Sequence, residues 1–289
     1  MDRVSQIARA VLYEGYLLWP YRPSARKNRQ RWTFGAVFPP AWTRLHPDDP
    51  NVLQAQVLVE GPPGAEIAIT LRFLHVVEVQ GEPPWEEAVE RELVLAGDAS
   101  HLAIAGDEAQ GRRWHEIEGI LSARSEPLGT RLRRLTVRFE NRTKWAGADR
   151  AEALRHATVS THLALRTDDA GFVSLVDPPA EVAAAAQRCV NVGTWPVLVG
   201  EPGDHSQMLC APIILGDHPQ IAPESPGDLF DGGEIDQLLI LNVLALTDAE
   251  KREMRDCDPR AAEILDRCSA LGRDELMRLH GAIRELRPL

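Results

Sequence analysis

The 289-residue sequence lacks the patterns that mark the commonest membrane, secreted and nucleotide-dependent proteins. No apolar run approaches the ~20 residues that a membrane-spanning helix requires. The N-terminus has no basic segment followed by an apolar one, as a secretory signal would have. There is also no phosphate-binding loop, dinucleotide-binding glycine motif, HExxH or GxSxG. We therefore expect a cytoplasmic protein without a transmembrane segment, outside the common nucleotide-dependent enzymes.

Cysteine and lysine are both scarce. Only three of the 32 basic residues are lysines, so arginine is the usual cation of this chain and a single arginine says little about binding. The cysteines are widely spaced and form no CxxC pair, which argues against a zinc ribbon or a thioredoxin-like motif. They are most simply reduced structural thiols. These residues are Cys189, Cys210, Cys257 and Cys268.

Aromatic residues make up 6% of the sequence, yet half of them lie between residues 13 and 42. All three tyrosines belong to this segment, and arginines are interleaved with the rings. The segment is basic, although the whole chain has a formal net charge of −11. Because interfaces are enriched in tyrosine, tryptophan and arginine, the segment is a candidate surface for a protein partner. The candidate contact residues are Tyr13, Tyr16, Trp19, Tyr21, Arg22, Arg26, Arg29 and Trp32.

Two other interpretations of this aromatic arm remain open. Its rings could pack the arm onto the rest of the chain without binding any partner. Alternatively, its arginines could contact phosphates while its rings stack on bases, which would make the chain a binder of nucleic acid or another anion. The acidic net charge opposes nucleic-acid binding except at a local basic patch.

Hydrophobic periodicity predicts a helix at the start of the chain. Apolar residues recur at three- and four-residue spacing from Val4 to Leu18, which places them on one stripe of a helix. Pro20 should end this helix, because proline removes an amide donor. The following residues, up to about residue 50, are rich in proline. Residues 1–50 are therefore expected to form a helix and an irregular arm.

From about residue 51 the apolar residues recur with a two-residue period, which is typical of half-buried strands. About seven such segments are separated by turn signals, with few helical segments between them. This arrangement predicts an antiparallel β-sandwich or open barrel over residues 51–177. The predicted strands lie near residues 52–59, 67–73, 90–95, 114–121, 135–139, 159–165 and 171–176.

Residues 178–289 are expected to be mainly helical and packed on the β domain, which makes the chain an α+β protein. Asp177 can cap a helix that begins at Pro178. Two short strands are expected near residues 196–199 and 208–215. The apolar segment 234–246 predicts a helix that is buried or lies in an interface. A capping box at Thr247 and Glu250, and the step Asp258-Pro259, mark the starts of two further helices.

The most distinctive chemical pattern is a repeated Gly-Asp-His sequence, at 203–205 and 216–218. Carboxylates and imidazoles brought together could bind a divalent metal or act as acid and base. However, neighbouring side chains of an extended segment point apart, and polar turn residues explain both sequences more simply. A metal-assisted hydrolase is therefore kept as an alternative only. Its candidate ligands are Asp204, His205, Asp217, His218 and Glu224.

The strand histidines His75, His115 and His162 are interpreted differently from the Gly-Asp-His residues. A lone histidine in a strand is more often a packed or surface residue than a metal ligand. We therefore expect these three residues to be structural. None of them is a candidate for catalysis.

Two segments, VLYEGYLLWPYRPSARKNRQRWTFG at 11–35 and DHPQIAPESPGDLFDGGEIDQLLILNVLALTDAEKREMRDCDPRAA at 217–262, resemble one group of bacterial proteins. These are uncharacterised proteins encoded beside actinobacterial-type nickel–iron hydrogenases. The resemblance implies an accessory role in assembling, maturing or anchoring the enzyme, with a hydrogenase subunit as partner. It supplies no catalytic residues. It does not extend to hydrogenase maturation peptidases, whose glycine-rich strand motif and spaced acidic and histidine nickel ligands are not recognisable.

The favoured function from sequence is therefore that of a non-enzymatic accessory protein, without a cofactor, that binds a protein partner. The aromatic arm and residues 216–246 are its expected contact surfaces.

Overall fold

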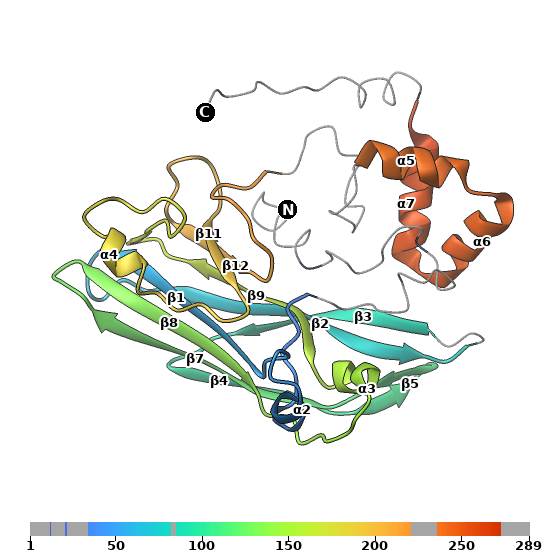
Figure 1. The fold of residues 1–289 in the computed structure, drawn as a ribbon, viewed down its shortest axis with the longest axis horizontal. Coiled ribbons are helices and arrows are strands. Elements are labelled where there is room, and N and C mark those ends of the chain that lie inside the picture. Colours follow the sequence, from blue (N-terminus) through green and yellow to red (C-terminus); the bar gives the residue numbers. More distant parts are fainter. Residues whose placement is uncertain (1–11, 13–20, 22–33, 82–84, 221–235, 273–289) are drawn as a thin grey trace. The chain divides into compact units, whose positions relative to one another are not determined.

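The computed structural model describes residues 12, 21, 34–81, 85–220 and 236–272 (Figure 1). The chain divides into two units. The first comprises residues 1–12 and 32–220, and the second comprises residues 13–31 and 221–289. All the described strands belong to the first unit, and the second contains three described helices. The predicted α+β class is thus confirmed.

Two open antiparallel sheets form the first unit. The five-stranded sheet has the order β10-β1-β8-β7-β4, and the seven-stranded sheet has the order β11-β12-β9-β2-β6-β5, with β3 also paired to β2. The first sheet consists of β1 (Val52–Glu60), β4 (Ala99–Ile104), β7 (Ile117–Pro127), β8 (Leu132–Asn141) and β10 (Gly171–Phe172). The second consists of β2 (Ala68–Val79), β3 (Trp85–Val94), β5 (Asp107–Ala109), β6 (Arg112–Trp114), β9 (Thr158–Arg166), β11 (Trp195–Leu198) and β12 (Gln207–Ala211).

One hydrophobic core lies between the two sheets, because alternate residues of both point into it. In β1 these are the odd-numbered residues from Leu53 to Val59, and in β2 they are Ile69, Leu71 and Phe73. Strand β8 contributes Leu135, Val137 and Phe139 to the same core. The two-residue period of the sequence therefore reflects a sandwich whose strands turn alternate residues into the core. Of the two predicted architectures, the sandwich is the one observed.

Side chains close the outer edge of β1 where no strand pairs with it. The oxygen Oδ1 of Asn191 accepts the amide of Gln56 at 2.8 Å, and the side chain of Gln56 accepts the amide of Val190 at 2.9 Å. Gln54 and Val192 exchange two backbone hydrogen bonds as an isolated bridge. Residues 190–192 thus substitute for a neighbouring strand, so that these backbone groups of β1 are not left open.

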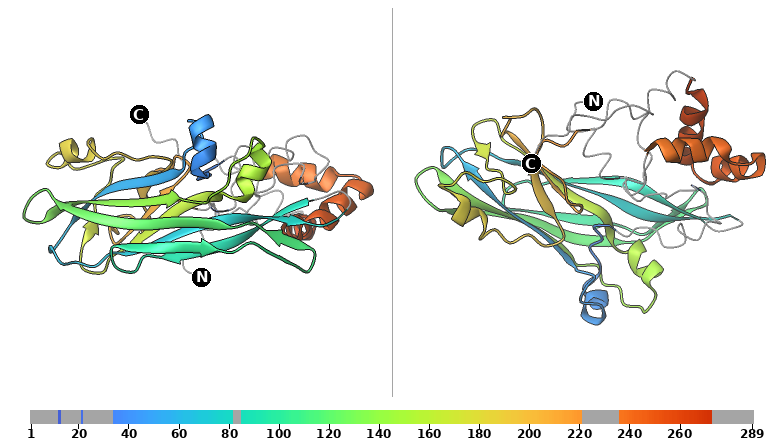
Figure 2. Two further views of the ribbon diagram at one scale, coloured as in Figure 1. Left: turned by 90° about the horizontal axis from the view of Figure 1, so that it is seen from below. Right: turned by 45° about the horizontal axis from the view of Figure 1, so that its top comes forward.

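Two short helices, α2 (Pro40–Leu45) and α3 (Arg150–Arg155), project from the same side of the sandwich in both views of Figure 2. The buried side chain of Asn141 links the chain segments beside them. Its Nδ2 atom donates to the carbonyls of Val37 (2.8 Å) and His156 (3.0 Å), and its Oδ1 atom accepts the amide of Thr143 (2.9 Å). One amide side chain therefore joins the end of β8, the segment before α2 and the end of α3.

The structure corrects several details predicted from sequence. The helix expected from Asp177 is only α4 (Ala183–Ala186), and its N-cap is Val182 without a side-chain hydrogen bond. The amide of Asp177 instead donates to Ser174 Oγ in a turn. Strands β4 and β5 and the helices α2 and α3 were not predicted. Residues 178–289 were expected to be mainly helical. Their first part instead belongs to the β unit, because strands β11 and β12 extend the sheet to Ala211.

The second unit contains α5 (Asp236–Ala245), α6 (Asp248–Cys257) and α7 (Pro259–Ala270). The predicted capping box is present, with Thr247 and Glu250 each bonding the backbone of the other. Asp258 caps α7, whose first residue is Pro259, as predicted. Leu239, Ile240 and Val243 of α5 are buried, in agreement with its apolar sequence. Within the described part of the chain, no helix has the length and apolar character needed to cross a membrane.

Candidate functional site

Most of the predicted partner-binding residues, namely Tyr13, Tyr16, Trp19, Arg22, Arg26, Arg29 and Trp32, lie outside the described residues. Tyr21 is described and its side chain is 0% exposed, so it is buried rather than displayed to a partner. Leu12, on the predicted apolar stripe, is helical and buried.

The end of the aromatic segment is mainly internal packing. Phe38 and Trp42 are buried and stack with their ring centroids 6.0 Å apart. The indole Nε1 of Trp42 donates to Asp49 Oδ2 at 2.9 Å, and the guanidinium of Arg150 lies 5.3 Å from the Phe38 ring centroid. These rings therefore hold α2 against the sandwich. Phe34 differs from them because it is 39% exposed.

The second Gly-Asp-His sequence protects the edge of a sheet. Strand β11 is an edge strand, and its residue Leu198 turns its backbone groups away from β12. Asp217 Oδ1 accepts the amide of Leu198 at 2.7 Å, and the amide of His218 donates to the carbonyl of Leu198 at 2.7 Å. Two residues earlier, Pro196 has no amide hydrogen to satisfy. Asp217 and His218 thus complete the hydrogen bonding of an edge strand.

Both carboxylate oxygens of Asp217 are engaged within the fold. While Oδ1 caps Leu198, Oδ2 accepts a 2.5 Å hydrogen bond from the hydroxyl of Ser174. Ser174 Oγ in turn accepts the amides of Val176 and Asp177. The serine hydroxyl is therefore fixed in a turn and is not presented as a nucleophile. Each oxygen of Asp217 thus already accepts one hydrogen bond within the fold.

The first Gly-Asp-His sequence also forms hydrogen bonds within the fold. Asp204 Oδ1 accepts hydrogen bonds from both the amide and the hydroxyl of Ser206, which lower the pKa of Asp204. His205 Nδ1 lies 2.9 Å from the carbonyl of Phe172. Because a carbonyl oxygen only accepts, Nδ1 carries the hydrogen and Nε2 is the nitrogen left for another partner. Glu224, the fifth candidate ligand, lies outside the described residues.

Among the residues that the structure describes, no three histidine, cysteine, aspartate or glutamate side chains form a group able to hold a metal ion. The predicted ligands that are described therefore form no such group.

We expect Asp217→Ala to lower the free energy of unfolding by about 2 kcal/mol, because it leaves the Leu198 amide and the Ser174 hydroxyl without their acceptor. Asp168→Ala is the control, since Asp168 pairs with Arg166 on the surface. Thermal unfolding of both variants should be measured with and without Zn²⁺ or Mg²⁺. A divalent ion that stabilises the wild-type protein but not Asp217→Ala would favour the hydrolase alternative over the edge-capping role.

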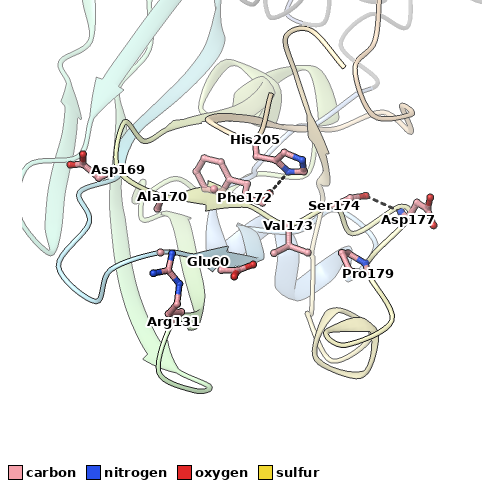
Figure 3. A pocket seen from close by; sticks show the side chains of 12 residues that line it. Glu60, Arg131, Asp169, Ala170, Phe172, Val173, Ser174, Asp177, Pro179 and His205 are labelled. Atoms are coloured by element: carbon pink, nitrogen blue, oxygen red, sulfur yellow. Dashed lines mark hydrogen bonds between the residues drawn. The ribbon is translucent and has the colours of Figure 1, made fainter. Parts of the chain in front are cut away.

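A pocket of about 460 Å³ lies beside His205 (Figure 3). Its apolar wall includes Phe172, Val173 and Pro179, and charged groups surround it. Figure 3 shows that these charged side chains do not converge on one point, because Asp169 and Asp177 lie on opposite sides of the view. The remaining charged or polar lining residues are Glu60, Arg131, Ser174 and His205. The arrangement has no nucleophile–base pair and no cluster of ligands, so it provides no catalytic constellation.

The strand histidines differ in their surroundings. His75 and His162 are fully buried, and neither ring nitrogen of His75 forms a hydrogen bond. Burial, together with nearby cations, lowers the pKa of each of these two residues from 6.5 to about 4. His115 is half-buried, and its Nε2 atom lies 2.8 Å from Glu78. The expected structural role of His75 and His162 agrees with this burial.

Several exposed hydrophobic residues of the first unit belong to chain segments that meet near Pro212. We define the Pro212 patch as Phe34, Val192, Trp195, Pro212 and Ile214. The exposed fractions of its four large hydrophobic residues are 39% for Phe34, 39% for Val192, 41% for Trp195 and 80% for Ile214. This surface was not predicted, because its residues come from three distant parts of the sequence.

Specific contacts bring the three segments of the Pro212 patch together. A Cβ atom on Gly35, at φ +57°, would lie 2.6 Å from Pro212 Cβ, so the segment of Phe34 passes directly over Pro212. Gly35, Gly193 and Pro212 line one pocket of about 330 Å³. The indole Nε1 of Trp195 donates to the carbonyl of Leu215 at 3.0 Å, next to Ile214. The segments are thus joined by packing against Pro212 and by one side-chain hydrogen bond to a backbone carbonyl.

No protein-family model and no curated protein matches the sequence.

Proposed function

We propose that the chain is a non-enzymatic accessory protein that binds a protein partner, and that the Pro212 patch is a contact surface. The main observation in support is the half-exposed Trp195. Its indole N–H is already bonded to Leu215, so the exposed part of the ring gains no hydrogen bond from water. Burying such a ring and the neighbouring Ile214 against a partner is favourable, and tryptophan is enriched among the residues that dominate binding energy.

The rigidity of the Pro212 patch supports the same proposal. Thr194 Oγ1 donates to the carbonyl of Ala211, and Trp195 pairs with Ala211 across β11 and β12. The patch is therefore held in position before a partner arrives. Association then orders few side chains and loses less conformational entropy.

An enzymatic function receives less support from the described residues. Asp217 and Ser174 are committed to each other and to backbone amides. Among the described residues, the pocket beside His205 offers a free imidazole Nε2 but no partner group placed to use it as a base. We therefore retain binding as the proposed function.

The partner that we propose is a subunit of a nickel–iron hydrogenase. Support for this identity comes only from the resemblance of residues 11–35 and 217–262 to proteins encoded beside such enzymes. The accessory role would be assembly, maturation or anchoring of the enzyme. The aromatic arm remains a second proposed contact through its residues before Trp32.

The test is affinity purification of the tagged chain from its native host, followed by binding measurements with the purified partner. We expect Trp195→Ala with Ile214→Ser to weaken binding by about 30-fold, the equivalent of ~2 kcal/mol. Val94→Ser is the matched control, because Val94 is 56% exposed on β3 and lies outside the patch. Circular dichroism should show the same fold for all variants.

The outcomes separate the parts of the proposal. Unchanged binding by the patch variant removes the Pro212 patch from the interface, and Tyr16→Ala with Arg29→Ala then tests the arm. A stable partner that is not a hydrogenase subunit contradicts the hydrogenase assignment alone. Recovery of no stable partner contradicts the accessory function itself.

A further inference from the structure

A shallow pocket of about 270 Å³ in the second unit is lined mainly by cations. Three of its four charged residues are basic, whereas carboxylates outnumber bases in the described helices around it. The lining residues are Asp248, Lys251, Arg252 and Arg255 of α6, together with Leu265 and Ser269 of α7. The pocket is therefore a local concentration of positive charge in an acidic region of the chain.

Helix geometry explains why these cations gather. Lys251 and Arg255 are four residues apart, and Arg252 and Arg255 are three apart, so each pair shares a face of α6. Leu265 of α7 is 2% exposed and provides an apolar floor. The three cationic side chains repel one another, and Asp248 and Asp266 offset only part of their charge.

Most of the hydrogen-bond donors of the three cations remain available. Lys251 Nζ donates to the carbonyl of Leu244 at 2.9 Å, and Arg252 Nε donates to the carbonyl of Asp248 at 3.2 Å. Neither residue forms an ion pair with a carboxylate among the described residues. Arg255 pairs with Asp266 through one Nη2 contact of 2.6 Å, at an exposed position. The outer N–H groups of Arg252 and Arg255 can therefore donate hydrogen bonds to an oxyanion.

We propose that this pocket binds the phosphate group of a small phosphorylated molecule. Phosphate carries compact multiple charge, and guanidinium groups bind it through paired N–H···O bonds. The three lining cations surround one small pocket, which fits a single compact anionic group such as a phosphate. A long acidic peptide fits less well, because its flanking charges would approach the surrounding carboxylates of α6 and α7, including Asp256, Glu263 and Asp266. This ligand site is independent of the protein-binding function proposed for the first unit.

Calorimetric titration of the full chain with pyrophosphate at low ionic strength tests the site, since salt screens exposed charges. We expect saturable binding by the wild-type protein. Arg252→Gln with Arg255→Gln should weaken it at least roughly tenfold, because charge-assisted hydrogen bonds are lost. Arg252→Lys should retain part of the affinity, since it keeps the charge but loses the planar fork. Arg166→Gln, which removes an exposed arginine of β9, is the control and should bind like the wild type.

Several results would overturn the proposal. One is that the wild-type protein, with intact helical circular dichroism, shows no saturable binding of pyrophosphate. Another is that the double variant binds pyrophosphate with the same affinity as the Arg166→Gln control. A third is that a polyglutamate peptide binds through Arg252 and Arg255 while pyrophosphate does not bind. The ligand would then be an acidic polypeptide and not a phosphate. Partner binding through the Pro212 patch should be the same in all these variants, so failure of one proposal leaves the other intact.

Discussion

Asn141→Ala is expected to lower the free energy of unfolding by about 3 kcal/mol. Asn141 is fully buried, and its side chain satisfies the carbonyls of Val37 and His156 and the amide of Thr143. Each buried polar group left without a partner costs about 1–3 kcal/mol, and three such groups would be left unpaired or exposed to entering water. Urea denaturation of the wild type and the variant measures this difference directly.

The change Asn141→Asp gives the sharper test because it alters little except the donor. At neutral pH a buried carboxylate would face two carbonyl oxygens that now have no donor, so we expect a loss at least as large as that for alanine. The difference from the wild type, compared at the same pH, should shrink when the carboxyl is protonated in acid. Asn191→Asp is the matched control: Asn191 uses only its Oδ1 acceptor toward Gln56, which aspartate retains. Equal losses at positions 141 and 191 would contradict the role given to Asn141.

Acidification from pH 7 to pH 5 is expected to destabilise the fold by about 2 kcal/mol for each of His75 and His162. Burial is the main cause that lowers the pKa of both residues from 6.5 to about 4. Arg91, His115 and His156 add to this effect at His75, and Arg72 adds to it at His162, although a backbone contact opposes it in each case. The folded state therefore binds fewer protons than the unfolded chain. The stabilisation is complete above pH 6.5 and is lost progressively as the pH falls toward 4.

The histidine contributions are separated by substitution. His75→Gln and His162→Gln remove the titrating group, so the stability of each variant should fall less steeply between pH 7 and pH 5 than that of the wild type. His101→Gln, at an exposed position on β4, should keep the wild-type slope. Unfolding free energies measured by urea denaturation at several pH values provide the slopes. A wild-type slope in both buried-histidine variants would mean that other groups cause acid sensitivity.

The fold class could be predicted because the strongest signals are local. In β2, β8 and β9 alternate apolar residues point into the core, and this produces an alternation visible in the sequence. The helix caps at Thr247 and Asp258 were also predictable, since capping depends on residues within one turn. By contrast, β5 has three residues, which is too short for a period to appear. The strand predicted near residues 171–176 is present only as the two residues of β10.

The candidate sites could not be predicted fully, because they depend on contacts between residues that are far apart in the sequence. The Pro212 patch joins residues 34, 192–195 and 212–214, and nothing in the separate segments indicates that Gly35 passes over Pro212. The Asp-His residues were interpreted most simply as polar turn residues, but their hydrogen-bond partners were not predictable. Asp217 reaches Ser174, 43 residues earlier, as well as Leu198. The cations of α6 were visible in sequence, yet their pocket also requires Leu265 and Ser269 of α7.

The side-chain closure of β1 and β11 restricts how the sandwich can associate with another polypeptide. The side chain of Asn191 accepts the amide hydrogen of Gln56, and that of Asp217 accepts the amide hydrogen of Leu198. Pro196 has no amide hydrogen. An incoming extended chain would have to displace these groups before it could extend either sheet at these positions. Intermolecular strand addition there is therefore disfavoured, and so is the fibril growth that begins with it. The polar residues at these edges thus oppose strand addition in the same unit that exposes Trp195 and Ile214 to solvent.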